Sequence, residues 1–361
     1  MDFYRIGMPL RAILDNQEVQ SFNQTNEEWQ NLKNSYRNHE LTMHCCDRKA
    51  IPKTSKLGTH YFAHSKLGDC SSAPETVEHL HLKYLAAKAA TECGWEVYTE
   101  YHGETKAGEK WIADVYCSKG KAAIALEMQW SQQTEEEFKR RQGRYAESGV
   151  RCAWLYRLHG RREYTRDDLS QSEDLPIFGF RKDLDTNSFI VSQFKLQVEE
   201  FIKALLTGQM SWSPKSGDEL EVGLIPFIEP CWRCKKGTAA VIGLDIQDKL
   251  GNHLGLPTFL EPGTVEWITK YYSPIQLAVH GIGPIKKRYS KTINKEYISN
   301  GCTHCDALLG TNYIRQQIRQ TFYAYDERLP IKPRITWLYN SAQIKLKTDW
   351  RLNGRKGEYL F

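Results

Sequence analysis

Residues 111–130 read WIADVYCSKGKAAIALEMQW and predict two antiparallel strands joined by a tight turn. The first half, residues 111–117, is rich in β-branched and aromatic side chains, which favour a pleated strand. The second half, residues 122–130, is a nearly continuous apolar run, typical of a strand buried on both faces. Lys119 and Gly120 are expected to form the hairpin loop, with Gly120 at positive φ.

This hairpin carries two acidic residues, of which Glu127 is the one that folding alone explains least. The expected loop places Asp114 opposite Ala125, so Glu127 becomes a diagonal neighbour of Asp114 about 7 Å away on the same face. Gln129 joins that face because side chains alternate along a strand. A carboxylate in a buried strand is costly unless it is paired or binds a metal, so Glu127 is a candidate ligand. Two such carboxylates suit one hard cation.

The flanking residues predict two helices and a further strand. Pro74 suits the first position of a helix that ends near Gly94, a residue able to adopt the left-handed conformation. Residues 134–137, Thr-Glu-Glu-Glu, predict a capping box at the start of a second helix. Residues 151–156 form the next strand. Strand, helix and strand at this spacing favour a right-handed crossover to a parallel neighbour.

The order helix, three strands, helix, strand, with Asp on one strand and Glu-x-Gln on the next, resembles the PD-(D/E)XK nuclease core. The segment about 40–160 more narrowly resembles the competence protein CoiA family. The residues that carry the resemblance are His60-Tyr61-Phe62-Ala63-His64, Glu75-Thr76-Val77-Glu78-His79, Ala113-Asp114-Val115, Leu126-Glu127-Met128-Gln129-Trp130-Ser131, Arg141 and Tyr145. Gln129 stands where the superfamily usually has Lys, and the CoiA-like group itself carries Gln there.

The resemblance implies an α/β, restriction-endonuclease-like mixed sheet flanked by helices. It also implies a catalytic set of Glu78, Asp114, Glu127 and Gln129, in which Asp114 and Glu127 hold Mg²⁺ or Mn²⁺. Glu78 is preferred to Glu75 as the acidic residue contributed by the helix. Gln129 is expected to orient water or phosphate without carrying a charge.

A basic segment follows the acidic residues and indicates a polyanionic partner, DNA. The formal net charge is only +5, but cations gather at Lys139, Arg140, Arg141, Arg144, Arg151, Arg157, Arg161, Arg162 and Arg166. Arg141, Arg144 and Tyr145 are the expected nucleic-acid contacts. Arg141 and Tyr145 lie four residues apart, on one face of the expected helix. The alternative is a solvated helix face followed by a charged loop.

Two groups of cysteine and histidine residues indicate metal. Near the N-terminus the chain carries His44, Cys45, Cys46, His60, His64 and Cys70. CoiA-like proteins tend to have a small Cys/His module here, which implies zinc, with Cys46, His64 and Cys70 the preferred ligands. The alternative is a β-hairpin with core histidines and free thiols.

The second group is more regular. Cys231-x-x-Cys234 and Cys302-x-x-Cys305 are two knuckles of the kind that complete a four-thiolate structural zinc site. The stretch between them is longer than in compact zinc ribbons. The alternatives are four unrelated thiols or a redox role, and the latter lacks a surrounding βαβ pattern.

Composition and the position of the Ser-, Pro- and Gly-rich segment suggest three domains. They are an N-terminal Cys/His module over residues 1–71, a nuclease-like domain over 72–210 and a zinc-ribbon-like domain over 217–361. Ser211 to Gly217 is the best linker signal in the chain. Residues 175–180 and 188–191 read as strands that extend the central sheet.

The first residues resemble neither a signal nor a transit peptide, and the sequence contains no run of eighteen apolar residues. A cytoplasmic protein with no membrane partner is therefore expected. The favoured function is a metal-dependent DNA endonuclease in DNA uptake, recombination or phage defence. The alternative is a non-catalytic, zinc-containing DNA-binding accessory. RNA cleavage has no distinctive support, and the sequence leaves a protein partner or a homo-oligomer open.

Overall fold

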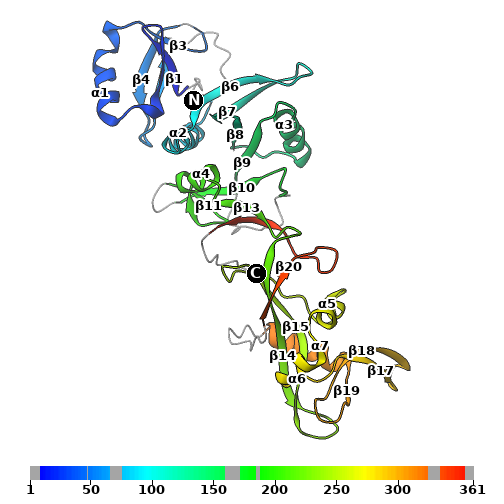
Figure 1. Ribbon diagram of the computed structural model, residues 1–361. Coiled ribbons are helices and arrows are strands. Elements are labelled where there is room, and N and C mark those ends of the chain that lie inside the picture. Colours follow the sequence, from blue (N-terminus) through cyan, green and yellow to red (C-terminus); the bar gives the residue numbers. More distant parts are fainter. Residues whose placement is uncertain are drawn as a thin grey trace. The chain divides into compact units, whose positions relative to one another are not determined.

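The structure is a computed structural model that describes residues 9–46, 48–65, 75–158, 171–183, 188–323 and 334–353. The chain folds into two compact units, Met1–Ser211 (unit 1) and Trp212–Phe361 (unit 2). Both units mix helices and strands (Figure 1), so the protein is mixed α/β.

Unit 1 begins with two small sheets beside a short helix. The sheet order β2-β1-β3 is antiparallel, and β4 pairs with β5 in a separate hairpin. Helix α1 starts at a capping box made by Thr25 and Glu28. Trp29 of α1 packs edge-on against Phe62 of β5 at 5.1 Å, so this helix shares a core with the hairpin. The bounds are β1 Arg11–Leu14, β2 Gln17–Gln20, η1 Ser21–Asn23, α1 Asn26–Ser35, η2 Tyr36–Asn38, β3 Leu41–Met43, β4 Ala50–Thr54 and β5 His60–His64.

A seven-stranded mixed sheet forms the centre of unit 1, in the order β12-β11-β10-β9-β8-β7-β6. Strands β6, β7 and β8 are antiparallel, whereas β8, β9 and β10 are parallel. Strands β11 and β12 close the other edge in antiparallel pairing. The bounds are β6 Glu96–Glu104, β7 Lys110–Lys119, β8 Ala122–Gln129, β9 Arg151–Arg157, β10 Ile177–Lys182, β11 Phe189–Val191 and β12 Leu196–Gln197.

Helices cover both faces of this sheet: α2 (Val77–Glu92) and α4 (Val198–Leu206) lie on one face and α3 (Glu135–Glu147) on the other (Figure 1). Phe138 of α3 packs edge-on against Trp154 at 4.9 Å. Phe201 of α4 packs against Phe178 at 4.7 Å. Phe178 pairs with Leu155, the residue after Trp154, so the two contacts lie on opposite faces.

The ends of α2 and α3 follow from their sequences, with two differences. Thr76, rather than Pro74, starts α2, because its side chain accepts the His79 N–H at 3.1 Å; Pro74 itself lies outside the described residues. Gly94 ends that helix at φ +74°, as predicted. Thr134 caps α3, but only half of the predicted capping box is formed, since Glu137 pairs with Arg140 instead.

The register of the β7–β8 hairpin differs from the prediction. Lys119 pairs with Ala122, so the loop is Gly120-Lys121, with Gly120 in the first position at φ +58°. A Gly-x loop accepts positive φ at its first residue, which explains the shift. Tyr116, not Asp114, therefore lies opposite Ala125.

Unit 2 is built on a four-stranded antiparallel sheet in the order β16-β15-β14-β20. Trp267 of α5 packs against Trp337 of β20 at 5.3 Å and anchors the core. The bounds are β13 Met210–Ser213, β14 Glu219–Pro230, β15 Gly237–Gln247, β16 His253–Gly255, α5 Thr264–Tyr271, α6 Pro274–Val279, β17 Lys286–Ser290, β18 Lys295–Gly301, β19 Leu308–Leu309, α7 Thr311–Tyr323, β20 Arg334–Leu338 and β21 Asp349–Leu352.

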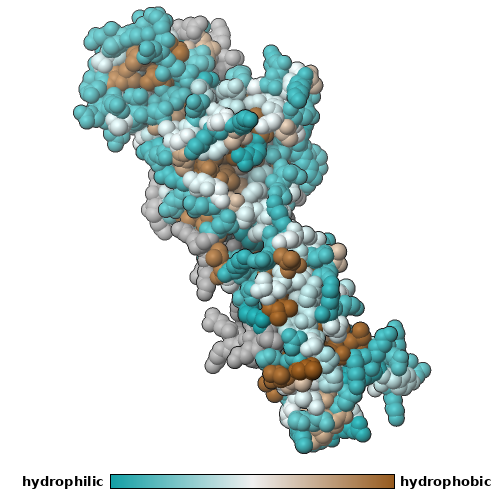
Figure 2. All heavy atoms as spheres, viewed as in Figure 1, coloured by the Kyte–Doolittle hydropathy of each residue, from teal (hydrophilic) through white to brown (hydrophobic). Residues whose placement is uncertain are grey.

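Figure 2 shows both units with a largely hydrophilic face interrupted by scattered apolar residues. Among the helices of the described segments, none combines the length and apolar character needed to cross a bilayer.

Candidate functional site

The acidic site lies where the β7 ladder is interrupted. Regular pairing with β8 reaches Val115 and Leu126, and pairing with β6 skips from Val115 to Ala113, so Asp114 falls in a gap. Its carboxylate instead accepts the backbone N–H of Met128 at 2.8 Å. Glu127, in turn, accepts a backbone hydrogen bond from Asp114. Each of the two carboxylates therefore accepts a backbone N–H from the strand that carries the other.

Glu127 is buried, with only 2% of its surface exposed. Arg141 of α3 donates to its Oε2 at 2.5 Å, and the Tyr145 hydroxyl contacts its Oε1. The same hydroxyl lies 3.1 Å from the carbonyl oxygen of Ile112. Glu127 is therefore a buried carboxylate whose two oxygens both face donors from α3.

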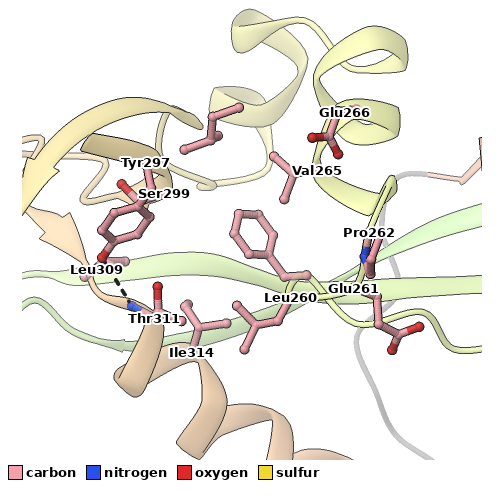
Figure 3. Close-up of a pocket in the computed structure, with 12 residues that line it drawn as sticks. Leu260, Glu261, Pro262, Val265, Glu266, Tyr297, Ser299, Leu309, Thr311 and Ile314 are labelled. Atoms are coloured by element: carbon pink, nitrogen blue, oxygen red, sulfur yellow. Dashed lines mark hydrogen bonds between the residues drawn. The ribbon is translucent and has the colours of Figure 1, made fainter. Parts of the chain in front are cut away.

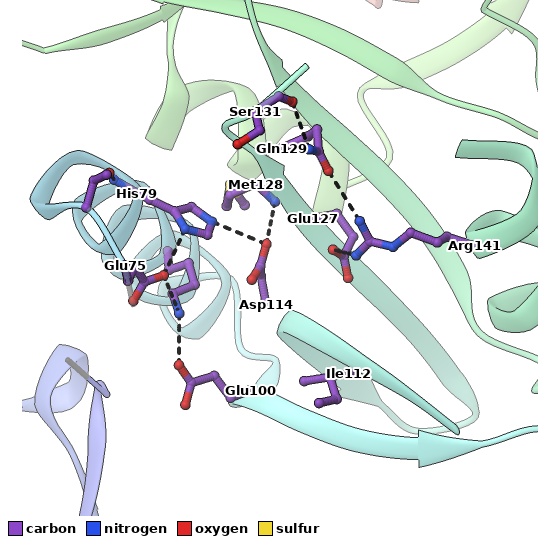
Figure 4. A network of polar contacts seen from close by, with 12 residues as sticks. Glu75, His79, Glu100, Ile112, Asp114, Glu127, Met128, Gln129, Ser131 and Arg141 are labelled. Atoms are coloured by element: carbon purple, nitrogen blue, oxygen red, sulfur yellow. Dashed lines mark hydrogen bonds and ion pairs between the residues drawn. The ribbon is translucent and has the colours of Figure 1, made fainter. Parts of the chain in front are cut away.

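Asp114 faces the other helix layer. His79 of α2 places its Nε2 3.5 Å from the Asp114 carboxylate and its Nδ1 2.9 Å from Glu75 (Figure 4). These contacts correct the prediction that the side chains of Asp114 and Glu127 share one face of the sheet. The two carboxylates are neighbours at the strand gap, but α2 contacts one and α3 the other.

The two carboxyl groups differ in acidity because their neighbours differ. Burial alone would raise the pKa of Asp114, but the contact with His79, with the charge of Lys83 and the Met128 N–H, lowers it to about 2. Burial and the nearby Asp114 charge raise the pKa of Glu127 to about 7, although Arg141 opposes this. Asp114 is therefore the stronger acid of the two.

Gln129 is held by its neighbours rather than left free. Its Oε1 accepts from Arg141 at 3.2 Å, and its Nε2 donates to the Ser131 carbonyl at 2.8 Å. The Arg141 guanidinium also stacks over the Trp154 ring at 4.6 Å. Arg141 therefore spans Glu127 and Gln129 (Figure 4), so the structure brings three of the predicted site residues together.

Glu75, just before α2, joins this network in place of Glu78. Its carboxylate contacts His79 and lies 2.7 Å from Lys83, which is also 3.0 Å from Glu100. The preference for Glu78 is corrected by this arrangement, because Glu75 precedes the helix and turns back across its first turn. Lys83 is 3% exposed, and both of its ion pairs lie within the protein.

His79 is the residue that sequence reasoning did not assign to the site. Burial alone would lower the pKa of His79, but its contacts with the carboxylates of Asp114 and Glu75 raise it to about 9. The signal was present in the sequence, because Glu75 and His79 are four residues apart, the spacing at which side chains meet on a helix.

The predicted nucleic-acid residues take three different positions. Arg141 contacts Glu127, as above, and Arg144 donates to Glu109 at 2.9 Å with its side chain 27% exposed. Tyr145 is 1% exposed and packs against Trp111, so it supports the site from within instead of facing a ligand. Arg161, Arg162 and Arg166 lie outside the described residues.

The donor set at the strand gap is suitable for a hard cation, because Asp114 and Glu127 offer carboxylate oxygens. Within the described segments, however, the acidic residues do not bring three ligand atoms within 4.8 Å of one another. Glu78 adds no ligand there. Arg141 presently supplies the positive charge that Glu127 requires.

The four cysteines of unit 2 converge, as the two knuckles predict. The first knuckle turns between β14 and β15, and the second between β18 and β19. Sγ of Cys231 lies 3.7 Å from that of Cys305, and Sγ of Cys234 lies 3.6 Å from that of Cys302. A tetrahedral zinc with Zn–S bonds of about 2.3 Å gives sulfur separations of about 3.8 Å. The cluster fits a structural zinc ion.

The N-terminal cysteines give a smaller cluster that includes Cys45. His64 Nε2 lies 3.2 Å from Cys46 Sγ and 3.7 Å from Cys45 Sγ. Cys70, the third predicted ligand, lies outside the described residues. His60 is a core side chain, since its ring stacks on Trp29 at 4.8 Å.

Comparison with known families bears on the same region. Residues 75–203 match the family model described as the nuclease-like domain of competence protein CoiA. The match runs from Glu75 into α4 and so contains the strand gap and both of its carboxylates. It supports the resemblance to the CoiA family and indicates a nuclease-like, competence-related function. No curated protein matches the chain.

Proposed function

We propose that this chain is a metal-dependent DNA endonuclease with its reacting centre at Asp114 and Glu127. The observation that carries the proposal is the placement of these two carboxylates on neighbouring strands, beside an interrupted ladder, within the segment that matches the CoiA nuclease-like domain. A restriction-endonuclease-like core would present its acids at such a place, and the helix–strand order of α2 to β9 is consistent with it.

Asp114 and Glu127 would hold Mg²⁺ or Mn²⁺, which when bound polarises a phosphoryl oxygen and acidifies a water. Asp114 is prepared for this role because His79 keeps it ionised. The Met128 N–H fixes the direction of its carboxylate. Gln129 would orient the attacking water once its amide is released from Arg141.

The remaining assignments are part of the proposal. The DNA substrate would contact unit 1 through the exposed parts of Arg141 and Arg144, and a structural zinc would hold the knuckles of unit 2. We propose a cytoplasmic protein with functional segments at 1–71, 72–210 and 217–361. The proposed biological role is in DNA uptake and recombination, and the alternative role is in phage defence.

The test is cleavage of supercoiled plasmid and of linear DNA by zinc-loaded protein with added Mg²⁺ or Mn²⁺. Asp114→Asn and Glu127→Gln, which preserve size, are expected to lower the cleavage rate by about two orders of magnitude or more. Glu135→Gln, on the exposed start of α3, is the matched control and should cut like the parent. Parent protein that cuts no DNA form, or a Glu127→Gln variant as active as the parent, contradicts the proposal.

One observation favours the alternative, a non-catalytic DNA-binding accessory. Arg141 and Tyr145 already satisfy both oxygens of Glu127, as expected of a structural carboxylate. The accessory function predicts salt-dependent DNA binding that Mg²⁺ leaves unchanged and that persists in Glu127→Gln. Metal-dependent tightening of DNA binding, lost in Asp114→Asn, favours the endonuclease.

A further inference from the structure

A pocket of about 440 Å³ lies next to the acidic site, between α3 and the start of β7. Three cations line it, Lys110 at the start of β7 and Arg141 and Arg144 on α3. Arg141 and Arg144 are three residues apart and so project from one side of the helix. The pocket shares Arg141 with Glu127, which places it next to that carboxylate.

The walls of the pocket combine positive charge with an apolar surface. Ile112 is 52% exposed there, although it is a large aliphatic residue on a strand. The Trp111 ring forms another wall, and it lies across the backbone of Gly103 on β6. A Cβ at Gly103 would stand 2.0 Å from the Trp111 ring, so glycine is required for that ring position. The pocket is therefore built by close packing of its strands.

The cations of the pocket keep capacity for a ligand beyond their ion pairs. Arg144 pairs with Glu109, and Arg141 pairs with Glu127, but both arginines keep further N–H donors, since a guanidinium carries five. Lys110 is exposed and adds a third positive charge. A phosphate with an attached sugar would meet both these cations and the apolar side chain of Ile112.

We propose that this pocket binds a backbone phosphate of the DNA strand and that the phosphate draws Arg141 away from Glu127, so that substrate binding prepares the carboxylate pair for its metal ion. The inference rests on the proposed function, because it concerns the same site. A guanidinium 2.5 Å from Glu127 repels a divalent cation there. A phosphate that takes over part of the charge of Arg141 lifts that repulsion.

Because the coupling is thermodynamic, it must be reciprocal. A phosphodiester that strengthens metal binding by some factor must itself be bound more tightly by the same factor when metal is present. Couplings of this kind are about 5- to 150-fold in proteins. A structural role for Arg141 alone would give no such reciprocity.

The experiment measures Mn²⁺ binding to zinc-loaded, full-length protein by electron paramagnetic resonance of the free ion. The probe is the thymidine dinucleotide dTpdT, which carries one phosphodiester, and its uncharged methylphosphonate analogue is the control ligand. Mn²⁺ favours oxygen ligands, so the thiolate clusters hold it poorly. The proposal expects dTpdT to raise Mn²⁺ affinity at least about fivefold, Mn²⁺ to raise dTpdT affinity equally, and the analogue to do neither.

Two variants separate the pocket from the acidic site. Arg141→Gln should bind Mn²⁺ more tightly than the parent without dinucleotide and should respond little to dTpdT. Lys110→Gln, which contacts neither carboxylate in the described structure, should lose most of the dinucleotide effect. Lys121→Gln, an exposed lysine in the β7–β8 loop, is the matched control and should respond like the parent.

The proposal is overturned if dTpdT leaves Mn²⁺ affinity unchanged, if Lys110→Gln responds like Lys121→Gln, or if Arg141→Gln binds Mn²⁺ more weakly than the parent. These measurements contain no cleavage step. Protein that shows the coupling but cuts no DNA supports the phosphate pocket and contradicts the endonuclease. Protein that cuts DNA but shows no coupling supports the endonuclease and contradicts the phosphate pocket.

Discussion

The acidic cluster of unit 1 and the thiolate cluster of unit 2 place anionic ligands together in different ways. Asp114 and Glu127 are each matched by a protein cation, His79 on one side and Arg141 on the other. The sulfur atoms of Cys231 and Cys302 contact the other two cysteines and accept backbone N–H groups at 3.4 and 3.3 Å. The first cluster can fold with its own counter-charges, whereas four thiolates need an ion.

This difference separates an exchangeable metal site from a structural one. A closed four-thiolate site contributes its binding energy to folding. A site that already holds a guanidinium folds without metal and admits the ion only when that cation moves. The pockets of the two units also differ, since three cations line the one in unit 1, whereas Phe259, Leu260 and Ile314 give the one in unit 2 an apolar wall (Figure 3).

The largest expected effect is the removal of zinc from unit 2. Cys302→Ser should lower the zinc content by one ion per chain and destabilise unit 2 by several kcal/mol, a part of the roughly 10–16 kcal/mol with which zinc-finger peptides bind the ion. Elemental analysis and differential scanning calorimetry measure the two quantities. Cys93→Ser, outside both clusters, is the control. If unit 2 unfolds at the same temperature with and without zinc, the contrast between a structural and an exchangeable metal site fails.

The second effect is the loss of the cation that neutralises Glu127. Arg141→Ala should lower the free energy of unfolding of unit 1 by about 3–5 kcal/mol, because it leaves a buried carboxylate without its partner. Urea denaturation followed by tryptophan fluorescence measures it. The double variant Arg141→Ala with Glu127→Gln should recover part of the loss. A double variant no more stable than Arg141→Ala would mean that the guanidinium stabilises the fold by packing on Trp154 and not through charge.

The third effect concerns two histidines on α2 that titrate in opposite directions. The pKa of His81 is lowered to about 4 by burial and by Lys182, whereas that of His79 is raised to about 9. Imidazole proton NMR shifts as a function of pH measure both. Because the folded pKa of His81 lies below its unfolded value of about 6.5, its contribution to stability is present above that pH and is lost as the pH falls through 4.

The size of the His81 contribution is about 1–3 kcal/mol, after allowance for partial solvent contact. His81→Gln should therefore flatten the stability of unit 1 between pH 6.5 and 4 without altering the zinc content of unit 2. The control is His280→Gln in unit 2, which should leave the pH dependence of unit 1 stability as it is in the parent. Equal pKa values for His79 and His81 in the NMR titration would contradict the prediction that their environments shift the two pKa values in opposite directions.

The smallest effect tests the helix that carries Arg141. Thr134 caps α3 by accepting the Glu137 N–H at 3.2 Å. Thr134→Ala should cost about 1 kcal/mol of unit 1 stability, and Thr134→Ser, which keeps the hydroxyl, should cost little. Chemical denaturation measures both. A loss equal in the two variants would mean that the methyl group, and not the cap, matters.

Local patterns were enough to predict much of the architecture. The helix end at Gly94 and the parallel pairing of β8 with β9 follow from glycine conformation and from the spacing of strand, helix and strand. The strands at 177–182 and 189–191 extend the sheet, as their apolar runs predict. The convergence of four cysteines follows from the knuckle spacing. Each of these depends on neighbours close in sequence or on a repeated motif.

The site required more than local patterns. The hairpin loop moved by one residue because Gly120 prefers the first loop position, and that shift placed Tyr116, not Asp114, opposite Ala125. Glu75 replaced Glu78 because its carboxylate reaches His79 at 2.9 Å and Lys83 at 2.7 Å on α2. Cys45 joined Cys46 and His64 because the turn after β3 brings both thiols to the end of β5.

The sequence by itself determined which residues carry charge, which positions alternate along each strand and where two thiol pairs could meet. These properties follow from side-chain chemistry and from short periods of the backbone. Only the tertiary structure decided that Arg141 neutralises Glu127, that His79 pairs with Asp114 and that Lys110 opens onto a shared pocket. Such contacts depend on strand register and on the rotation of each helix against the sheet, which packing sets across the whole unit.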